Sequence, residues 1–347
     1  MAKIKIEEGK GSAMSALRRL KPSVIVFSLL LCLFAGAAGI VVGFFAARVS
    51  NHSEDSSKQV RQSGNYQYIN PLLECEIAEG SIDVRKENFH ADLEKFIEAL
   101  KEENKLTEMS VYFRDLNNGP AFGINTEGKF FPASLLKVPV MMVYYHLAEE
   151  RPDLLKEQIF FDAPVDLGVN QGIIPRISLE AGTSYTIEQL IERMIVYSDN
   201  QALHLLSEKI PTEELQNLFT MIGADTSVIR DAHAKLTVKE YAGFFRILFN
   251  SSYLSRNFSE HALKVLSFTD YHDALPAGVP QDMKVSHKFG EAGTNWNERQ
   301  LHDCGIVYVP QHPYLICIMT RGRDIGNLKD SIRETSRFVY QKVDEQY

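Results

Sequence analysis

The chain has 347 residues, enough for one large domain with additional segments. Its net charge of -8 argues against nucleic acid as the main partner, because phosphate backbones are bound by clustered lysine and arginine. The sequence contains no Cys-x-x-Cys pair and no His-Glu-x-x-His motif, so we expect neither a metal nor another cofactor.

An apolar segment near the N-terminus predicts a membrane anchor. Residues 24–47 carry no charged side chain, and about 20 apolar helical residues span a bilayer core. Basic residues precede this segment, whereas Arg48 is followed by a mixed polar stretch. The positive-inside rule therefore predicts a cytoplasmic tail over 1–22, a single-pass anchor in the plasma membrane over 23–47, and an extracytoplasmic remainder.

A cleaved signal peptide is the alternative for this segment, but its apolar core would be only about 7–15 residues long. No Ala-x-Ala cleavage site follows the segment. Small residues recur in it at every fourth position, which would allow two anchors to pair into a homodimer. An unpaired glycine-rich helix is the other possibility. The small residues are Ala35, Gly39, Gly43 and Ala47.

The remainder divides into a linker over 48–84 and a catalytic domain over 85–347. The domain begins with an amphipathic helix over 87–105 and a hairpin over 109–124, and it ends with a helix over 328–343. Two strands, over 304–309 and 314–320, precede the last helix. Cys304 and Cys317 fall on this second hairpin, and the sequence leaves open whether they form a disulfide or remain buried thiols.

Helices occupy the middle of the chain. Thr186 and Gln189 form a capping box, so a helix is expected to start near Ile187, and another is expected over 237–249. Strands at both ends with helices between them predict an α+β fold. Its antiparallel sheet would be flanked by the terminal helices, and the site would lie in the seam between the sheet and a helical subdomain.

A serine and a lysine three residues apart are the first candidate for chemistry. Ser134 and Lys137 lie within an apolar run and would share one helical face. A serine hydroxyl needs a base to become a nucleophile, and a buried lysine can be that base because burial lowers its pKa. A capping serine with a solvent-seeking lysine is the alternative for the pair alone. Pro139 is expected to cost one backbone hydrogen bond in this helix.

Two motifs downstream strengthen the chemical interpretation. They are Ser198-Asp199-Asn200, and Lys288-Phe289-Gly290 ahead of the C-terminal strands. In this order the three motifs resemble those of the penicillin-recognising serine enzymes, the class A β-lactamases and the penicillin-binding proteins. The resemblance covers about residues 85–347. It implies a β-lactamase/transpeptidase-like fold.

The resemblance also implies roles for the catalytic residues. Ser134 would be the acyl-accepting nucleophile and Lys137 its general base. Lys288 would keep Lys137 neutral by like-charge repulsion and attract an anionic substrate, and Ser198 would pass a proton to the leaving nitrogen.

The remaining site residues would bind the substrate. Asn200 would bind the substrate's amide carbonyl and orient the lysine base, while Asp199 would hold its own loop. Gly290 would allow a close backbone approach, and the backbone N–H groups of Ser134 and Glu291 would form the oxyanion hole.

The sequence departs from the resemblance at two places. Class A β-lactamases use a loop glutamate to activate the deacylating water, yet the corresponding residues 222–235 contain no glutamate. Asp231 or His233 would be the substitutes, and an ordinary surface turn is the alternative for this stretch. Phe289 replaces a threonine or serine that grips the substrate carboxylate, and Thr294 is a candidate replacement. His302-Asp303 looks like part of a catalytic triad, but adjacent strand residues face opposite ways.

The resemblance therefore implies a membrane-anchored, class A β-lactamase-like serine hydrolase. It would act through an acyl-enzyme at Ser134 on β-lactam or peptidoglycan-like amide substrates, with slow deacylation. A D-alanyl-D-alanine carboxypeptidase or other penicillin-binding protein is one alternative. An acylatable sensor or binding domain that does not hydrolyse its ligand is another.

Overall fold

The computed structural model describes residues 66–71, 84–103, 105–117, 121–167, 172–295 and 298–346. The predicted anchor and most of the predicted linker lie outside these residues. In the described part of the chain, no helix combines the length and the apolar character needed to cross a bilayer.

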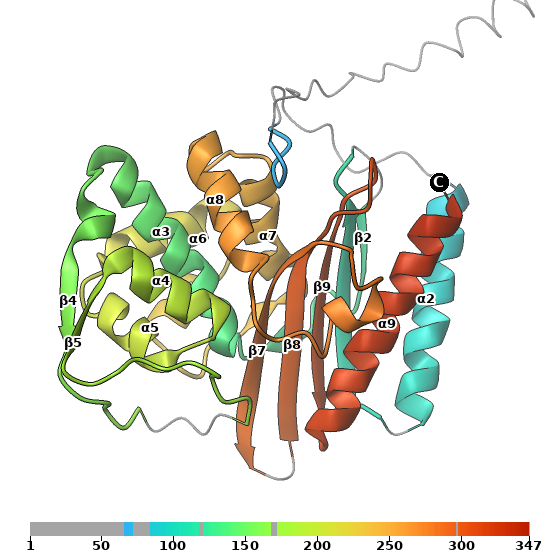
Figure 1. The fold of residues 1–347 in the computed structure, drawn as a ribbon. Coiled ribbons are helices and arrows are strands. Elements are labelled where there is room, and N and C mark those ends of the chain that lie inside the picture. Colours follow the sequence, from blue (N-terminus) through green and yellow to red (C-terminus); the bar gives the residue numbers. More distant parts are fainter. Residues whose placement is uncertain are drawn as a thin grey trace, which may run out of the picture. The chain divides into compact units, whose positions relative to one another are not determined.

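A five-stranded antiparallel sheet forms the centre of the domain, with the strand order β2-β1-β9-β8-β7 (Figure 1). The first hairpin is confirmed. The second begins earlier than predicted, because β8 includes the buried polar residues Gln300, His302 and Asp303, which lack the apolar signature of a core strand. The strands are β1 (Glu108–Asp115), β2 (Ala121–Ile124), β7 (Val285–Asn295), β8 (Glu298–Val307) and β9 (Tyr314–Gly322).

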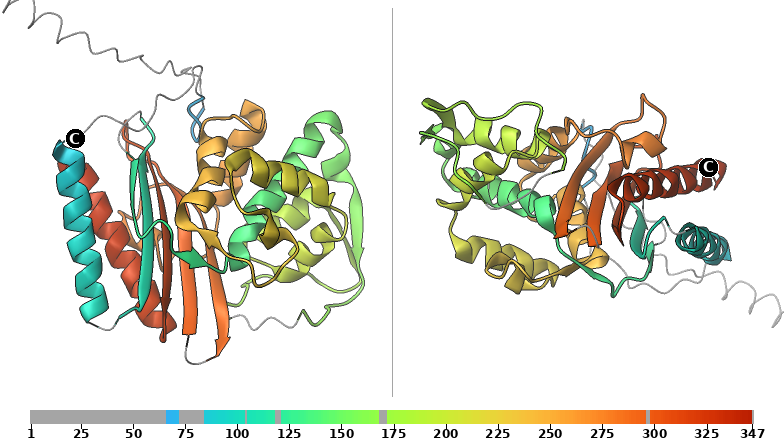
Figure 2. Two further views of the ribbon diagram at one scale, coloured as in Figure 1. Left: turned by 180° about the vertical axis from the view of Figure 1, so that it is seen from behind. Right: turned by 90° about the horizontal axis from the view of Figure 1, so that it is seen from below.

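Both faces of the sheet are covered, so β9 is buried on both sides. Its odd-numbered residues Leu315 and Cys317 belong to the core shared with the middle helices, whereas Ile316 and Ile318 belong to a second core. The two terminal helices, α2 (Val84–Glu102) and α9 (Ile325–Gln346), lie together over that second core (Figure 2). The predicted α+β arrangement is confirmed.

A helical subdomain lies on the other side of the sheet, and α3 runs through its middle with most side chains buried. The predicted capping box at Thr186 starts α4, and the structure shows a second capping box, at Thr237, that starts α7. The helices are α3 (Lys137–Glu150), α4 (Ile187–Val196), α5 (Asn200–Ser207), α6 (Thr212–Ile222), α7 (Val238–Phe249) and α8 (Arg256–Leu266).

The described residues also form short strands and single-turn helices. Strand β3 pairs with β6, and β4 pairs with β5. The short strands are β3 (Lys129–Phe130), β4 (Gln158–Phe161), β5 (Thr183–Thr186) and β6 (Leu236–Thr237). The single-turn helices are η2 (Ala133–Leu136), η3 (Leu154–Lys156), η4 (Thr226–Ile229) and η5 (Pro276–Gly278).

Residues 66–71, which fall within the predicted linker, pack on the helical subdomain. The carboxylate of Glu260 on α8 accepts hydrogen bonds from the backbone N–H groups of Gln67, Tyr68 and Ile69 at 2.7, 2.8 and 3.0 Å. The side chains of Tyr68 and Ile69 are buried in the core of the subdomain. This short stretch is therefore part of the folded unit.

Cys304 and Cys317 are direct partners in the β8–β9 register and form a disulfide. Both are fully buried beneath the helical subdomain. The structure thus selects the disulfide over the two buried thiols that the sequence left open.

Candidate active site

Ser134 and Lys137 meet where η2 continues into α3. The Lys137 Nζ lies 2.9 Å from the Ser134 Oγ, as expected for residues three apart in a helix. Lys137 is completely buried, whereas Ser134 is partly exposed and lines a pocket. The alternative of a solvent-seeking lysine is therefore wrong.

The sheet holds the segment that leads into Ser134. The Phe131 N–H donates to the Gln300 Oε1 at 3.0 Å, and the Phe131 carbonyl accepts from the His302 Nε2 at 3.0 Å. The His302 Nδ1 accepts the Thr320 N–H, so its proton is on Nε2. Burial lowers the His302 pKa to about 4, and this imidazole is therefore neutral.

A tyrosine compensates for the proline in α3. Pro139 has no N–H to donate to the Leu135 carbonyl four residues earlier. The buried Tyr241 hydroxyl on α7 donates to that carbonyl at 3.0 Å instead. The predicted loss of a backbone hydrogen bond is thus made good from another helix, which also fixes the turn that carries Ser134.

The Ser198-Asp199-Asn200 motif forms the start of α5. Ser198 has a φ of 57°, a conformation rare outside glycine, and such strain is concentrated at functional sites. Asp199 caps α5 by accepting the Gln201 and Ala202 N–H groups, and it also accepts the Leu179 N–H at 3.2 Å. Asp199 therefore fixes the local backbone, as predicted.

Lys137 joins the first two motifs. Its Nζ lies 2.7 Å from the Ser198 carbonyl oxygen, 3.0 Å from the Ser198 Oγ and 2.7 Å from the Asn200 Oδ1. The carbonyl and amide oxygens can only accept, so a neutral amine would donate its two protons to them. The lone pair of that amine would then be available for a serine hydroxyl.

Burial is what favours the neutral amine. The pKa of Lys137 lies well below its usual value, first because the amine is desolvated and second because of the nearby Lys288, while Asp199 opposes the shift. The sequence analysis expected both burial and Lys288 to lower this pKa, and desolvation is the larger of the two causes.

Lys288 completes the cluster from β7. Its Nζ lies 2.9 Å from the Ser198 Oγ and 3.1 Å from the Phe289 carbonyl oxygen. Burial lowers its pKa to about 7, and the carboxylate of Asp303 acts in the opposite direction. Asp303 itself pairs with the His287 Nδ1 at 2.8 Å, not with His302, so no triad forms at that dipeptide.

Gly290 lies where β7 meets η2. A Cβ at this position would lie 2.9 Å from the Pro132 carbonyl oxygen and 3.2 Å from the Leu135 N, so the backbone itself would have to move. Gly290 therefore allows two protein segments, η2 and β7, to lie close together.

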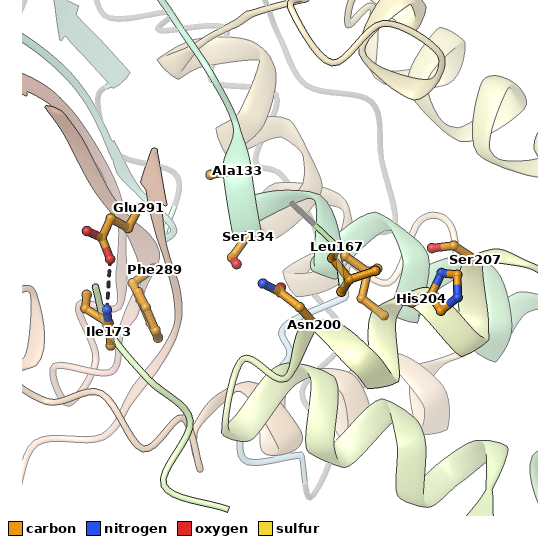
Figure 3. Close-up of a pocket in the computed structure, with 10 residues that line it drawn as sticks. Ala133, Ser134, Leu167, Ile173, Asn200, His204, Ser207, Phe289 and Glu291 are labelled. Carbon is orange, nitrogen blue, oxygen red and sulfur yellow. Dashed lines mark hydrogen bonds between the residues drawn. The ribbon is translucent and has the colours of Figure 1, made fainter. Parts of the chain in front are cut away.

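A pocket of about 400 Å³ opens in front of Ser134 (Figure 3). Ser134 and Asn200 face its middle, between Glu291, Phe289 and Ile173 on one side and Leu167, His204 and Ser207 on the other. Lys137, Ser198 and Lys288 are buried behind it. The lining residues are Ala133, Ser134, Leu167, Ile173, Asn200, Leu203, His204, Ser207, Phe289 and Glu291.

The predicted substitutes for the glutamate do not reach the pocket. Asp231 and His233 are exposed and bonded to each other through the His233 N–H, so the surface-turn alternative holds. His204 lines the pocket instead, four residues after Asn200 on the same face of α5, a spacing that the sequence contained. The side chain of Thr294 lies outside the described residues.

Phe289 fills the position of the missing hydroxyl with an apolar ring. Its side chain is buried and packs on Tyr271, with ring centroids 4.3 Å apart. The described residues that line the pocket include no lysine or arginine. This wall of the pocket offers apolar contact where a carboxylate would need a donor.

Comparisons with known proteins agree with the motifs and the fold. A model of the Beta-lactamase enzyme family matches residues 92–343. The fold is similar to that of PBP-A (22% identity, TM-score 0.62, covering 73% of this chain and 96% of that one). It is also similar to a β-lactamase from Burkholderia phymatum (18% identity, TM-score 0.62, covering 74% of this chain and 99% of that one). A β-lactamase from Sphaerobacter thermophilus is similar too (18% identity, TM-score 0.61, covering 74% of this chain and 97% of that one). No curated protein sequence matches the chain.

The lowered pKa of Lys288 predicts a pH-dependent stability. The folded protein releases this proton near pH 7 and the unfolded chain near 10.5, so between these values the unfolded chain binds more protons. The free energy of unfolding should therefore rise from pH 7 to about 9.5, and Lys288→Met should flatten the rise. Urea unfolding at several pH values measures the slope. The exposed Lys239→Met is the control, and equal slopes in wild type and Lys288→Met would contradict the prediction.

Proposed function

Because the chain belongs to the β-lactamase enzyme family and is thus a serine hydrolase, we propose that it forms an acyl-enzyme at Ser134 with a β-lactam or a peptidoglycan-like amide. The observation that carries the proposal is the buried Lys137 amine, 2.9 Å from the Ser134 hydroxyl and bonded to Ser198 and Asn200 of the second motif. Such an amine is a base prepared before substrate arrives.

Acylation begins with proton transfer. The Ser134 Oγ attacks the carbonyl carbon of the substrate and its proton passes to the neutral Lys137 Nζ, while the carbonyl becomes an oxyanion. The backbone N–H groups of Ser134 and Glu291 would stabilise that oxyanion, and Asn200 would bind the substrate's amide carbonyl.

Ser198 connects the base to the leaving group. Its hydroxyl lies 3.0 Å from the Lys137 Nζ and 2.9 Å from the Lys288 Nζ. The proton taken by Lys137 can move through this hydroxyl to the substrate nitrogen as the C–N bond breaks. Lys288 would stabilise the Ser198 hydroxyl while that hydroxyl gives its proton to the substrate nitrogen and accepts one from Lys137.

Hydrolysis of the acyl-enzyme would be the slow step. Glu291 is the carboxylate among the described lining residues, and its oxygens already accept from Arg299 and from two backbone N–H groups. A carboxylate so occupied is a poor general base for water. Slow deacylation favours a penicillin-binding protein with peptidase activity as the second candidate, and one structural neighbour is an acyl-enzyme complex of a PBP-A mutant with penicillin G.

The catalytic domain would be outside the cytoplasm, held by a single-pass anchor over 23–47. The apolar segment and its basic flank support this placement. The Cys304–Cys317 disulfide supports it independently, because structural disulfides persist in oxidising compartments. Residues 48–84 would then connect the anchor to the catalytic domain over 85–347.

Removing the nucleophile should abolish acylation. Ser134→Ala should lose covalent labelling by a fluorescent penicillin or a fluorophosphonate, and Lys137→Ala should slow labelling by about 10²–10⁴-fold, the usual contribution of a general base. Gel fluorescence and intact-mass spectrometry measure both. Ser184→Ala, at an exposed serine on β5, is the control. Equal labelling of Ser134→Ala would place the nucleophile elsewhere.

Turnover of penicillin should show a burst followed by a slow steady state, because acylation outpaces deacylation. Intact-mass spectrometry of the adduct gives both rates with the same penicillin. Decay as fast as formation would mean that the enzyme is an efficient β-lactamase with another water-activating base. His204, which lines the pocket, would then be mutated first.

The anchor predicts where the protein is found. Protease added to spheroplasts of a bacterial host should remove the large domain and leave a small membrane-bound fragment, while a cytoplasmic marker stays intact. A mature soluble protein beginning near Ser50 would show instead that the apolar segment is a cleaved signal.

A further inference from the structure

A segment of the β4–β5 connection joins the two sides of the pocket. At one end, the N–H groups of Gly172 and Ile173 donate to the Glu291 carboxylate on β7 at 3.0 and 2.9 Å. At the other end, the Leu179 N–H donates to Asp199 of the second motif. Residues 172–179, called the bridging segment below, therefore extend from the β7 wall to the loop that carries Ser198 and Asn200.

Both carboxylate oxygens of Glu291 are engaged by this arrangement. One oxygen accepts both N–H groups of the bridging segment, and the other accepts the Arg299 Nη2 at 2.6 Å. Only 8% of the Glu291 side chain is exposed. A carboxylate this buried is stable only when its charge is compensated, which the Arg299 pair and the two amides provide.

Gly172 is adapted to the same contact. A Cβ on this residue would lie 2.5 Å from one Glu291 carboxylate oxygen and 3.0 Å from the other. A larger residue here would require the Glu291 carboxylate to shift away from its present position. The glycine and the glutamate lie 119 positions apart and each fits the other.

The contact sets the chemistry of one pocket wall. Its second amide belongs to Ile173, whose side chain lines the pocket next to Phe289 (Figure 3). Phe289 in turn packs on Tyr271. Because the Glu291 charge is paired with Arg299, this wall offers a substrate apolar surface.

We propose that the Glu291 side chain is a positioning residue for substrate specificity: it holds Gly172 and Ile173 against β7, so that Ile173 and Phe289 form an apolar wall that selects substrates presenting an uncharged, apolar group there. This specificity refines the proposed function and depends on acylation at Ser134. The apolar wall favours amides and β-lactams that place a neutral group next to β7. Substrates that place a free carboxylate there are disfavoured.

The test compares penicillin G with its methyl ester, using intact-mass spectrometry to measure both acylation rates. Wild type should acylate with the ester at least as fast as with the acid. Gly172→Ala and Glu291→Gln should lower the ester-to-acid ratio by about tenfold, the effect of losing roughly one methylene contact in an apolar pocket. Glu298→Gln, which removes a carboxylate from the adjacent strand, should leave the ratio unchanged.

Hydrogen–deuterium exchange of the amides at Gly172 and Ile173 provides a readout independent of catalysis. Exchange should be slow in wild type and in Glu298→Gln, and faster in Gly172→Ala and Glu291→Gln. An ester-to-acid ratio that stays constant while exchange accelerates would overturn the specificity role. Unchanged exchange in both Gly172→Ala and Glu291→Gln would overturn the contact itself. Absence of any adduct in wild type would instead contradict the proposed acylation.

Discussion

The structure of the site depends on one buried amine. Lys137 is withdrawn from water at the start of α3, and its Nζ is bonded to the first motif through Ser134 and to the second through Ser198 and Asn200. A charged lysine in that position would lose its hydration, so burial favours the neutral form. The hydrogen bonds of the amine therefore connect the two motifs, and its burial prepares the base.

The neighbouring elements support the position of that amine from several sides. Gln300 and His302 fix the segment before Ser134, and Tyr241 donates to the carbonyl that Pro139 leaves without a partner. Gly290 allows η2 to lie directly against β7. Preorganisation of this kind matters because a catalytic hydrogen bond that has to form during the reaction costs free energy at that moment.

Local patterns in the sequence predicted much of this, and long-range contacts account for what they missed. Spacing placed Ser134 beside Lys137, and the capping box at Thr186 located the start of α4. No periodicity connects Gly172 with Glu291 or Phe131 with His302, because these contacts depend on how distant segments pack. Asp231 and His233 were candidates only through their place in the chain, whereas His204 follows from the helical face shared with Asn200.

If Lys137 is the neutral base of acylation, the pH dependence of Ser134 labelling by an uncharged fluorophosphonate tests that role most directly. We predict a rate that rises with pH and reaches its plateau well below 10.5, the ordinary pKa of a lysine. In Lys288→Met the rise should move to higher pH, because a neighbouring positive charge that lowers the Lys137 pKa is gone. A rate that continues to climb to pH 10.5, or a profile that Lys288→Met leaves in place, would contradict this role for Lys137.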